Sequence, residues 1–401
     1  GRINLAQDAP DATASTWLLG HGFAIAGSSY SSTGWAVADA LKDQIAVLDL
    51  FNQRFAKPKR VIAWGVSLGG IVTAGLVQAY PDRFAAAIPL CGVLAGGVAT
   101  WNAGLDAAYA FKTLLAPASQ VQLVGITDPQ TNIQLAGQIF DAASATPAGQ
   151  ARIALIAALG DLPGWFDIVG PQPAPTDYAG QEAAQARWES QVDFPFEFQY
   201  RADLEQKAGG NPSWNTGVDY AHQLAISANS AEVTALYRAA GLDLAADLRA
   251  LNAGKRIKAN PSAVAYLDQA TSFDGNLTVP VLTMHTIGDG LVVPQNETAY
   301  ADVVLAAGKQ DMLRQLFVHR AGHCAFSDSE TIVAFQAMLA RLDTGRWDDA
   351  ALSVASLNSA AQALGDTYNK VGGFLISPPS FASFAAGPYP RPFPKGSHVP
   401  T

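Results

Sequence analysis

Residues 60–70 read RVIAWGVSLGG, and this stretch decides the fold. An apolar run of β-type residues leads into residues 65–69, which form a G-x-S-x-G motif, and an apolar helical pattern follows. A serine hydroxyl is a poor nucleophile unless it is exposed and touches a base, so the backbone must turn sharply around Ser67. The glycines two residues before and after it leave room for that turn. The following helix points its N-terminus at the serine, so the backbone NH of Leu68 can donate to a developing oxyanion.

Apolar β-type runs alternate with amphipathic helical stretches near both ends of the chain. The predicted strands cover residues 23–27, 60–65, 84–90, 279–286 and 313–319, and the predicted helices cover residues 35–51, 70–80, 294–308 and 331–341. Alternation of this kind is typical of a parallel sheet with helices on both faces. The sequence therefore predicts an α/β fold with a mostly parallel sheet flanked by helices.

The middle of the chain is different, because residues 93–274 are mostly helical and Ala-rich and are broken by Pro- and Gly-containing loops. We predict a core of residues 1–92 and 275–401, with residues 93–274 inserted between sheet strands as a large, mainly helical lid. The predicted lid carries four tryptophans and the aromatic run DFPFEFQY at residues 193–200. These aromatic side chains either make the lid's own core or contact an aromatic or lipid-like substrate.

A nucleophilic serine needs a base, and the base needs a carboxylate that orients it. In this type of sheet the chain order is serine, acid, histidine. Asp289 follows the predicted strand 279–286, and His323 lies in a glycine-containing loop after the predicted strand 313–319. His319 is the rival base, but it still belongs to the strand and would approach Ser67 less freely. We therefore predict Ser67, Asp289 and His323 as the catalytic residues.

Composition excludes several classes of protein. The chain has 401 residues, of which 49% are hydrophobic and 15% charged, so it can build a large core. Its formal net charge of −9 argues against nucleic acid or an anionic membrane surface as the main partner. We also expect no membrane span, because no apolar run is long enough. The polar first eleven residues do not read as a signal peptide.

These residues, in this order, resemble the α/β-hydrolase superfamily. The resemblance is carried by GVSLGG at 65–70, YPDRF at 80–84, HTIGDGLV at 285–292 and AGHCAF at 321–326. It covers roughly residues 17–92 and 276–341, and within the superfamily the chain looks like secreted bacterial esterases and prolyl-oligopeptidase-like hydrolases with a large helical cap. The resemblance implies Ser67 as nucleophile, His323 as base and Asp289 as orienting acid, with no metal or organic cofactor.

One departure from the family concerns the second oxyanion donor. Members normally have several strands before the first strand seen here, ending in an HG-type loop that supplies this donor. His21-Gly22 lies too close to Ser67 to be that loop, so we expect the first part of the sheet to be absent, supplied by another segment or cut away. Ser29 and Tyr30, after the predicted strand 23–27, lie at the edge of the sheet where they can help; the alternative is that they only shape a turn.

The two cysteines are the last feature that the sequence singles out. Cys91 follows the predicted strand 84–90 and Cys324 is adjacent to His323, so both belong at the C-terminal edge of the sheet. A disulfide between them would clamp the histidine loop to the sheet and imply an oxidising compartment. The alternative is two buried, reduced thiols. We favour the disulfide, and with it a secreted protein, extracellular or periplasmic.

The sequence thus predicts a serine hydrolase that cleaves carboxylic esters of small molecules through an acyl-enzyme. A peptidase or amidase on the same three residues stays open, because sequence motifs do not separate amide from ester cleavage. So do acyl transfer to an alcohol and an inactive binding protein, although retention of all three catalytic residues argues against the latter.

Overall fold

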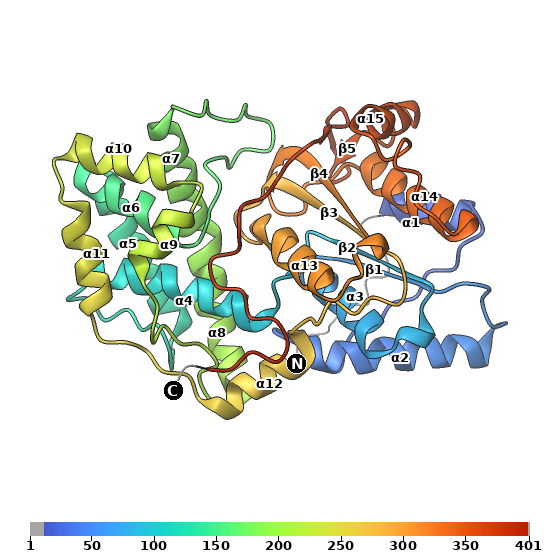
Figure 1. The fold of residues 1–401 in the computed structure, drawn as a ribbon, viewed down its shortest axis with the longest axis horizontal. Coiled ribbons are helices and arrows are strands. Elements are labelled where there is room, and N and C mark those ends of the chain that lie inside the picture. The colour runs from blue at the N-terminus through green and yellow to red at the C-terminus, as the bar shows by residue number, and fades with distance from the viewer. Residues whose placement is uncertain (1–11, 400–401) are drawn as a thin grey trace. The chain divides into compact units, whose positions relative to one another are not determined.

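The computed structural model describes residues 12–399, so the polar first eleven residues lie outside the described part. The chain forms two compact units. Among the described residues, the core unit contains residues 12–94, 273–287 and 300–385, and the helical unit contains residues 95–272, 288–299 and 386–399. Figure 1 labels their helices and strands. Within residues 12–399, no helix combines the length and the apolar character that crossing a bilayer requires.

A five-stranded sheet with strand order β1-β2-β3-β4-β7 organises the core unit. Its strands are β1 (Ile62–Val66), β2 (Ala86–Leu90), β3 (Val281–Gly288), β4 (Leu313–Ala321) and the short β7 (Phe381–Ala382). β1, β2 and β3 run parallel, and β7 is antiparallel to β4. Every residue of β2 and β3 is buried, as expected for strands covered on both faces. The predicted α/β fold with a mostly parallel sheet is therefore confirmed.

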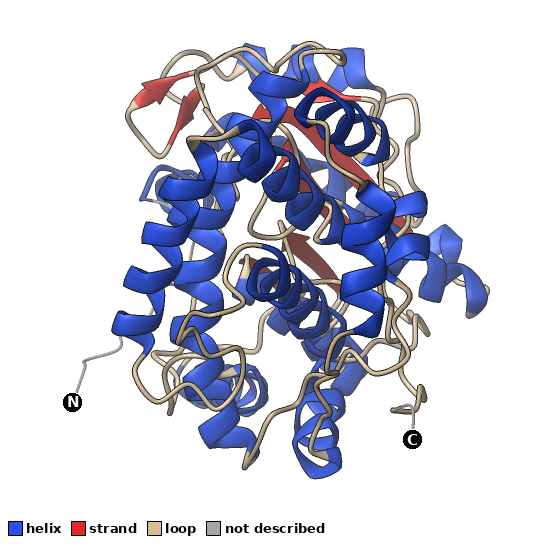
Figure 2. Ribbon diagram, turned by 90° about the vertical axis from the view of Figure 1, so that its left-hand side faces the viewer, coloured by secondary structure: helices blue, strands red, loops and turns tan. Residues whose placement is uncertain are grey.

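Helices flank this sheet, as Figures 1 and 2 show. They are α1 (Ala12–Gly20), α2 (Val37–Arg54), α3 (Leu68–Ala79), α13 (Gln295–Ala306), α14 (Asp328–Thr344) and α15 (Val354–Ala363), and a small hairpin of β5 (Lys370–Val371) and β6 (Leu375–Ile376) follows α15. Trp17 of α1 and Phe335 of α14 pack in one apolar cluster with Ile88 of β2 and Met284 of β3. This cluster holds α1 and α14 against the sheet.

The predicted sheet was wrong at one strand and missed another. Residues 23–27, predicted as a strand, belong to neither a helix nor a strand and join no sheet within the described residues. Phe23 and Ile25 instead bury their side chains against the apolar cluster, and the Phe23 ring meets Phe335 edge to face at 5.3 Å. Burial of Phe23 and Ile25 is enough to explain the alternation of apolar residues in this segment. Such alternation shows which side chains are buried, but it does not show whether a neighbouring strand is present. The two-residue β7 is too short to leave a sequence pattern.

The helical unit is built around its own apolar core. Its helices are α4 (Gly97–Leu114), α5 (Pro129–Ser144), α6 (Pro147–Leu159), α7 (Tyr178–Trp188), α8 (Phe194–Ala208), α9 (Tyr220–Ile226), α10 (Ser230–Ala240), α11 (Leu244–Ala253) and α12 (Pro261–Thr271). α6 is the centre of this core, because every residue from Ile153 to Leu159 is fully buried. All four tryptophans of this segment are also buried. The aromatic side chains therefore serve mainly as core.

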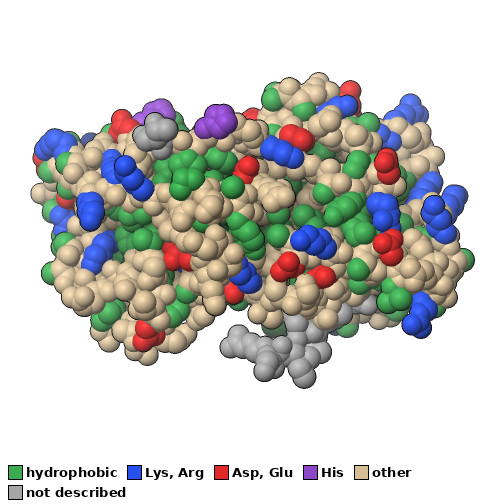
Figure 3. All heavy atoms as spheres, turned by 90° about the horizontal axis from the view of Figure 1, so that it is seen from below, with side chains coloured by type: hydrophobic (Ala, Val, Ile, Leu, Met, Phe, Trp, Pro, Cys, Tyr) green, Lys and Arg blue, Asp and Glu red, His purple; other side chains and the backbone are tan. Residues whose placement is uncertain are grey.

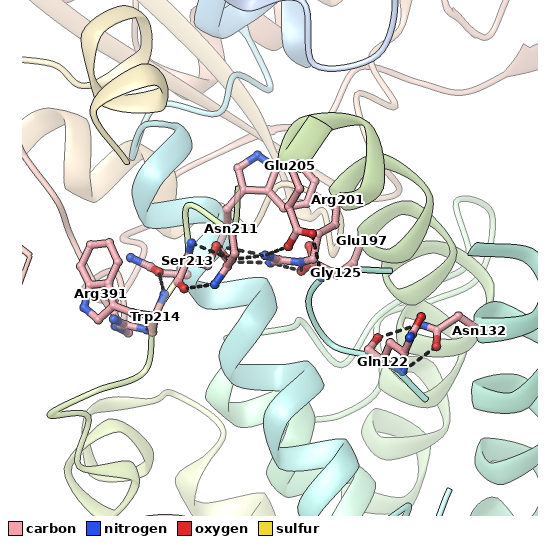
Figure 4. A network of polar contacts seen from close by, with 12 residues as sticks. Gln122, Gly125, Asn132, Glu197, Arg201, Glu205, Asn211, Ser213, Trp214 and Arg391 are labelled. Carbon is pink, nitrogen blue, oxygen red and sulfur yellow. Dashed lines mark hydrogen bonds and ion pairs between the residues drawn. The ribbon is translucent and has the colours of Figure 1, made fainter. Parts of the chain in front are cut away.

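A buried charge network ties the helices of this unit together (Figure 4). Arg201 of α8 is completely buried, and its guanidinium donates to Glu197 on the same helix. It also donates to the carbonyl oxygen of Trp101 in α4 at 3.0 Å and to the hydroxyl of Ser213 at 3.2 Å. A buried guanidinium needs several acceptors, and these residues provide them. The network fixes α8 against α4.

Candidate active site

Ser67 occupies the turn between β1 and α3. Its backbone has φ +56° and ψ −120°, a conformation that a residue with a side chain rarely adopts. The turn is held in place because the Ser67 NH donates to the carbonyl of Leu90, at the end of the neighbouring strand β2, at 3.0 Å. Gly65 is required sterically, since a Cβ there would lie 2.6 Å from the carbonyl oxygen of Gly69. The turn therefore carries local strain, as functional sites often do.

The imidazole of His323 meets this serine. Its Nε2 lies 2.7 Å from Ser67 Oγ, within hydrogen-bond distance. The loop that carries His323 begins where β4 ends at Ala321, and the Gly322 carbonyl accepts a hydrogen bond from Thr286 Oγ1 of β3 at 2.7 Å. His319, the rival base, is exposed on β4, where its NH donates to the carbonyl of Ser380. The structure thus brings His323, rather than His319, to the serine.

Cys91 and Cys324 form a disulfide with a Cα–Cα distance of 5.4 Å, which confirms the predicted pairing. Cys91 directly follows β2 and is completely buried, so the bridge anchors the histidine loop to the middle of the sheet. The Sγ of Cys324 lies 3.4 Å from the Nε2 of His323. The bridge consequently restricts the loop at the residue next to the imidazole.

Left-handed backbone is concentrated around this site. Among residues 12–399, five non-glycine residues have positive φ: Tyr30, Ser67, Cys91, Asp161 and Cys324. Ser67 and the two cysteines belong to the site just described. Such conformations cost about 1–3 kcal/mol each and persist where the surrounding structure enforces them. Here the β2 hydrogen bond and the disulfide are the enforcing contacts.

The predicted oxyanion residues occupy two different settings. Leu68 is the first residue of α3, so its NH belongs to the helical turn whose NH groups have no acceptor within the helix. The NH of Tyr30, by contrast, donates to Ser28 Oγ at 3.0 Å. The next NH, of Ser31, donates to Asp43 of α2 at 2.6 Å. These bonds agree with a turn-shaping role for Tyr30. Its neighbour Ser29 is exposed.

Asp289 lies one residue beyond β3, in the part of the chain that packs with the helical unit. Its side chain is completely buried, and one carboxylate oxygen accepts the NH of Val292 at 3.0 Å. The next residue, Gly290, lies against the indole of Trp188, since a Cβ at Gly290 would come within 2.3 Å of that ring. Backbone and packing therefore both hold the Asp289 loop in one conformation.

Sequence reasoning missed a set of buried acidic residues in the helical unit. Burial raises the pKa of Asp161, Glu182 and Glu232 to about 7 and that of Glu189 to about 8. Burial also raises the pKa of Asp193 well above its usual range. An available signal was the spacing of Glu189 and Asp193, four residues apart just before an aromatic run. Within the described residues, no three His, Cys, Asp or Glu side chains are arranged to hold a metal ion.

Charged side chains on the surface are mixed in sign. On the face drawn in Figure 3, Lys and Arg side chains alternate with Asp and Glu. No basic patch gathers on that face, in agreement with the net charge of −9.

Comparison with known proteins places the chain in a family. The model of the prolyl oligopeptidase family matches residues 25–104. The o-phthalyl amidase of Xanthobacter agilis is 31% identical over 378 residues, which cover 86% of this chain and 82% of that protein.

Solved structures give weaker likenesses. Feruloyl esterase B from Aspergillus oryzae is 14% identical with a TM-score of 0.36, over 78% of this chain and 66% of that one. Another esterase from Aspergillus oryzae is 14% identical with a TM-score of 0.39, over 81% of this chain and 70% of that one. The assignment therefore depends on the amidase relative and on the serine motif with its fold. The chain belongs to the α/β-hydrolase superfamily of serine hydrolases, in the family of the o-phthalyl amidase of Xanthobacter agilis.

Proposed function

We propose that this chain hydrolyses carboxylic esters through an acyl-enzyme on Ser67. The observation that supports this most directly is the 2.7 Å contact between Ser67 Oγ and His323 Nε2 at a strained strand–helix turn. In this proposal His323 takes the hydroxyl proton as Ser67 attacks the ester carbonyl, and then gives it to the leaving alkoxide. Water, deprotonated by His323, then releases the acid and restores the serine.

Two further groups support the charges that form during the reaction. The Leu68 NH at the start of α3 donates to the oxyanion, a contact worth about 3 kcal/mol in comparable sites. Asp289 holds the imidazole in the tautomer with a proton on Nδ1 and stabilises the imidazolium. The buried, backbone-anchored carboxylate of Asp289 suits this role. Ser29 and Tyr30 stay proposals for the edge of the substrate site.

The second candidate is amide hydrolysis, favoured by the amidase relative at 31% identity. The same acyl-enzyme forms in both reactions, but an amine leaves only after His323 has protonated its nitrogen. The relative's name also suggests an aromatic acyl group, such as o-phthalyl, for this chain. The buried tryptophans of the helical unit do not add support for an aromatic substrate.

Two proposals concern the setting of the reaction. The helical unit, inserted between β2 and β3, would act as the lid predicted for residues 93–274 and would decide whether water or an alcohol accepts the acyl group. The disulfide beside His323 favours an oxidising compartment, as in a secreted protein.

The test combines covalent labelling with a substrate panel. A fluorophosphonate should modify Ser67, identified by peptide mapping, and labelling should disappear in Ser67→Ala. Matched p-nitrophenyl esters and p-nitroanilides of acetic, benzoic and o-phthalic acids then separate ester from amide cleavage and aromatic from aliphatic acyl groups. Undiminished turnover in Ser67→Ala would end the proposal.

A further inference from the structure

A π-helical turn, Glu189–Asp193, joins α7 to α8 in the helical unit. Turns of this kind insert an extra residue into a helix and often occur at functional sites. Glu189 is only 1% exposed, and neither of its carboxylate oxygens has a hydrogen-bond partner among the described residues. One carboxylate oxygen of Asp193 is likewise buried and unpartnered in that part of the chain. Three carboxylate oxygens of two residues four positions apart are thus buried without the donors that a carboxylate normally requires.

The charges around this pair are mostly negative. Besides burial, the groups that raise the pKa of Asp193 are Glu189, Asp289 and Glu197. Glu197 is bonded to Arg201, whose guanidinium is shared with backbone and side-chain oxygens of the network in Figure 4.

The other neighbouring elements add no basic partner to the pair. On α7, Arg187 binds Asp167 at the surface, and Glu182 is itself a buried acid. On α5, Asp141 is exposed. Within the described residues, the cations nearest in sequence to Glu189 and Asp193 are therefore committed to other acids.

The Asp289 loop lies directly against this turn. Gly290 packs on the indole of Trp188, the residue that precedes Glu189, and Leu291 belongs to the same small apolar cluster as Trp188 and Val192. A second negative charge on the pair would consequently act on Asp289 across a desolvated, apolar contact, where charges are poorly screened.

We propose that Glu189 and Asp193 share a proton beside the Asp289 loop, and that they act as positioning residues because the shared proton keeps a second negative charge away from Asp289 at neutral pH. The inference rests on the proposed function, in which Asp289 orients His323. Two adjacent carboxyl groups without a cation keep a proton because the second ionisation would place like charges together in an apolar setting. Burial accordingly raises the pKa of Glu189 to about 8.

The consequence is an alkaline limit on activity. As the pH rises past about 8, the pair gives its proton to solvent and a second negative charge appears next to Asp289. Repulsion then displaces the Asp289 loop or opens the π-helical turn, and the carboxylate no longer holds the imidazole. Glutamine or asparagine cannot ionise, so either substitution should prevent this second negative charge at high pH.

The experiment measures kcat and kcat/KM from about pH 6 to about pH 10 for the full chain and for Glu189→Gln and Asp193→Asn. Below about pH 7 all three should agree within about twofold, because the pair holds no more than one negative charge there. At about pH 9 the two variants should retain roughly five- to tenfold more of their neutral-pH activity than the unsubstituted chain. Glu182→Gln is the matched control, since it removes a buried acid of α7 that is not among the charges acting on Asp193, and it should leave the alkaline limb unchanged.

Identical alkaline limbs in all chains, or a shift in Glu182→Gln as large as in Glu189→Gln, would overturn the inference. Infrared difference spectra give a readout independent of activity, because a protonated carboxylic acid has a carbonyl stretch that a carboxylate lacks. This band should be present at neutral pH, lose intensity near pH 8 and be weaker in Glu189→Gln; its absence would also overturn the inference. Since the band does not depend on Ser67, failure of the proposed function and failure of the shared proton are distinguishable.

Discussion

The Nε2 of His323 and the Oγ of Ser67 lie 2.7 Å apart although 256 residues separate them in the chain. Three structural features produce this contact. The turn after β1 exposes the serine, the end of β4 presents the histidine at the same edge of the sheet, and the disulfide ties the residue next to the imidazole to the end of β2.

Single replacements should distinguish the role of His323, in the loop after β4, from that of His319, on β4 itself. His323→Ala should lower kcat/KM by about 10³-fold or more, because the serine loses its base. His319→Ala is the matched control, since His319 is exposed on the strand, and it should stay within about twofold of the unsubstituted chain. The measurement is steady-state hydrolysis of a p-nitrophenyl ester. Equal losses in both variants would contradict the assignment.

Replacing the orienting acid should affect kcat more than KM. Asp289→Asn should lower kcat by about 10³–10⁴-fold, because the amide cannot hold the required imidazole tautomer or stabilise the imidazolium. Asp274→Asn is the control: it removes an exposed acid in the segment that precedes β3 and should have little effect on kcat. If Asp289→Asn kept full activity while folding normally, another group would have to orient His323.

The two glycines of the serine motif should respond differently to alanine. Gly65→Ala places a methyl group 2.6 Å from the Gly69 carbonyl oxygen, so it should destabilise the fold by about 1–3 kcal/mol and reduce activity at least about tenfold. Gly69→Ala meets no atom within 4 Å and lies in the first turn of α3, so its free energy of unfolding should be unchanged or slightly higher. Urea denaturation of both variants checks this. Equal destabilisation would mean that the steric account of the turn is wrong.

Removing the disulfide should weaken both stability and activity. Cys91→Ala/Cys324→Ala should lower the free energy of unfolding by about 2–4 kcal/mol, because the unfolded chain gains the freedom of a long loop. We also expect several-fold lower kcat, since His323 is adjacent to the released residue. Treating the unsubstituted chain with a reductant should reproduce the change if the bridge is accessible to it. Unaltered kcat in the double variant would show that the His323 loop holds its conformation without the bridge.

The buried acids predict a pH dependence of stability. Burial raises the pKa of Glu182 and Glu232 from 4.5 to about 7 in the folded chain. Between about pH 4.5 and about pH 7 the folded state therefore holds protons that the unfolded state has released. These two groups consequently lower the free energy of unfolding as the pH rises through this window, and above it their contribution is constant.

Denaturation at about pH 5 and about pH 8 measures this effect. Glu232→Gln should show a smaller loss of stability between the two pH values than the unsubstituted chain. Asp243→Asn, an exposed acid that caps α11, is a control that should keep the original loss. A loss in Glu232→Gln equal to that of the unsubstituted chain would contradict the raised pKa.

Local sequence determined the strand–turn–helix unit around Ser67 and the α/β alternation, because each depends on residues within a few positions of one another. The apolar alternation of residues 23–27 led to the wrong prediction of a strand, because it indicates burial and not the presence of a partner strand. The motif also hides the difference between Gly65 and Gly69, which depends on the atoms that surround each Cα.

Only the tertiary structure decided which charges meet in an apolar setting. Glu189, Asp193 and Asp289 come from two segments about a hundred residues apart, and their desolvation is a sum over side chains from several helices. The same reason applies to the cysteines, whose pairing was inferred from sheet topology but required their Cα atoms to come within 5.4 Å. A chain can specify its turns locally, whereas burial and proximity between distant residues exist only once the helices have packed.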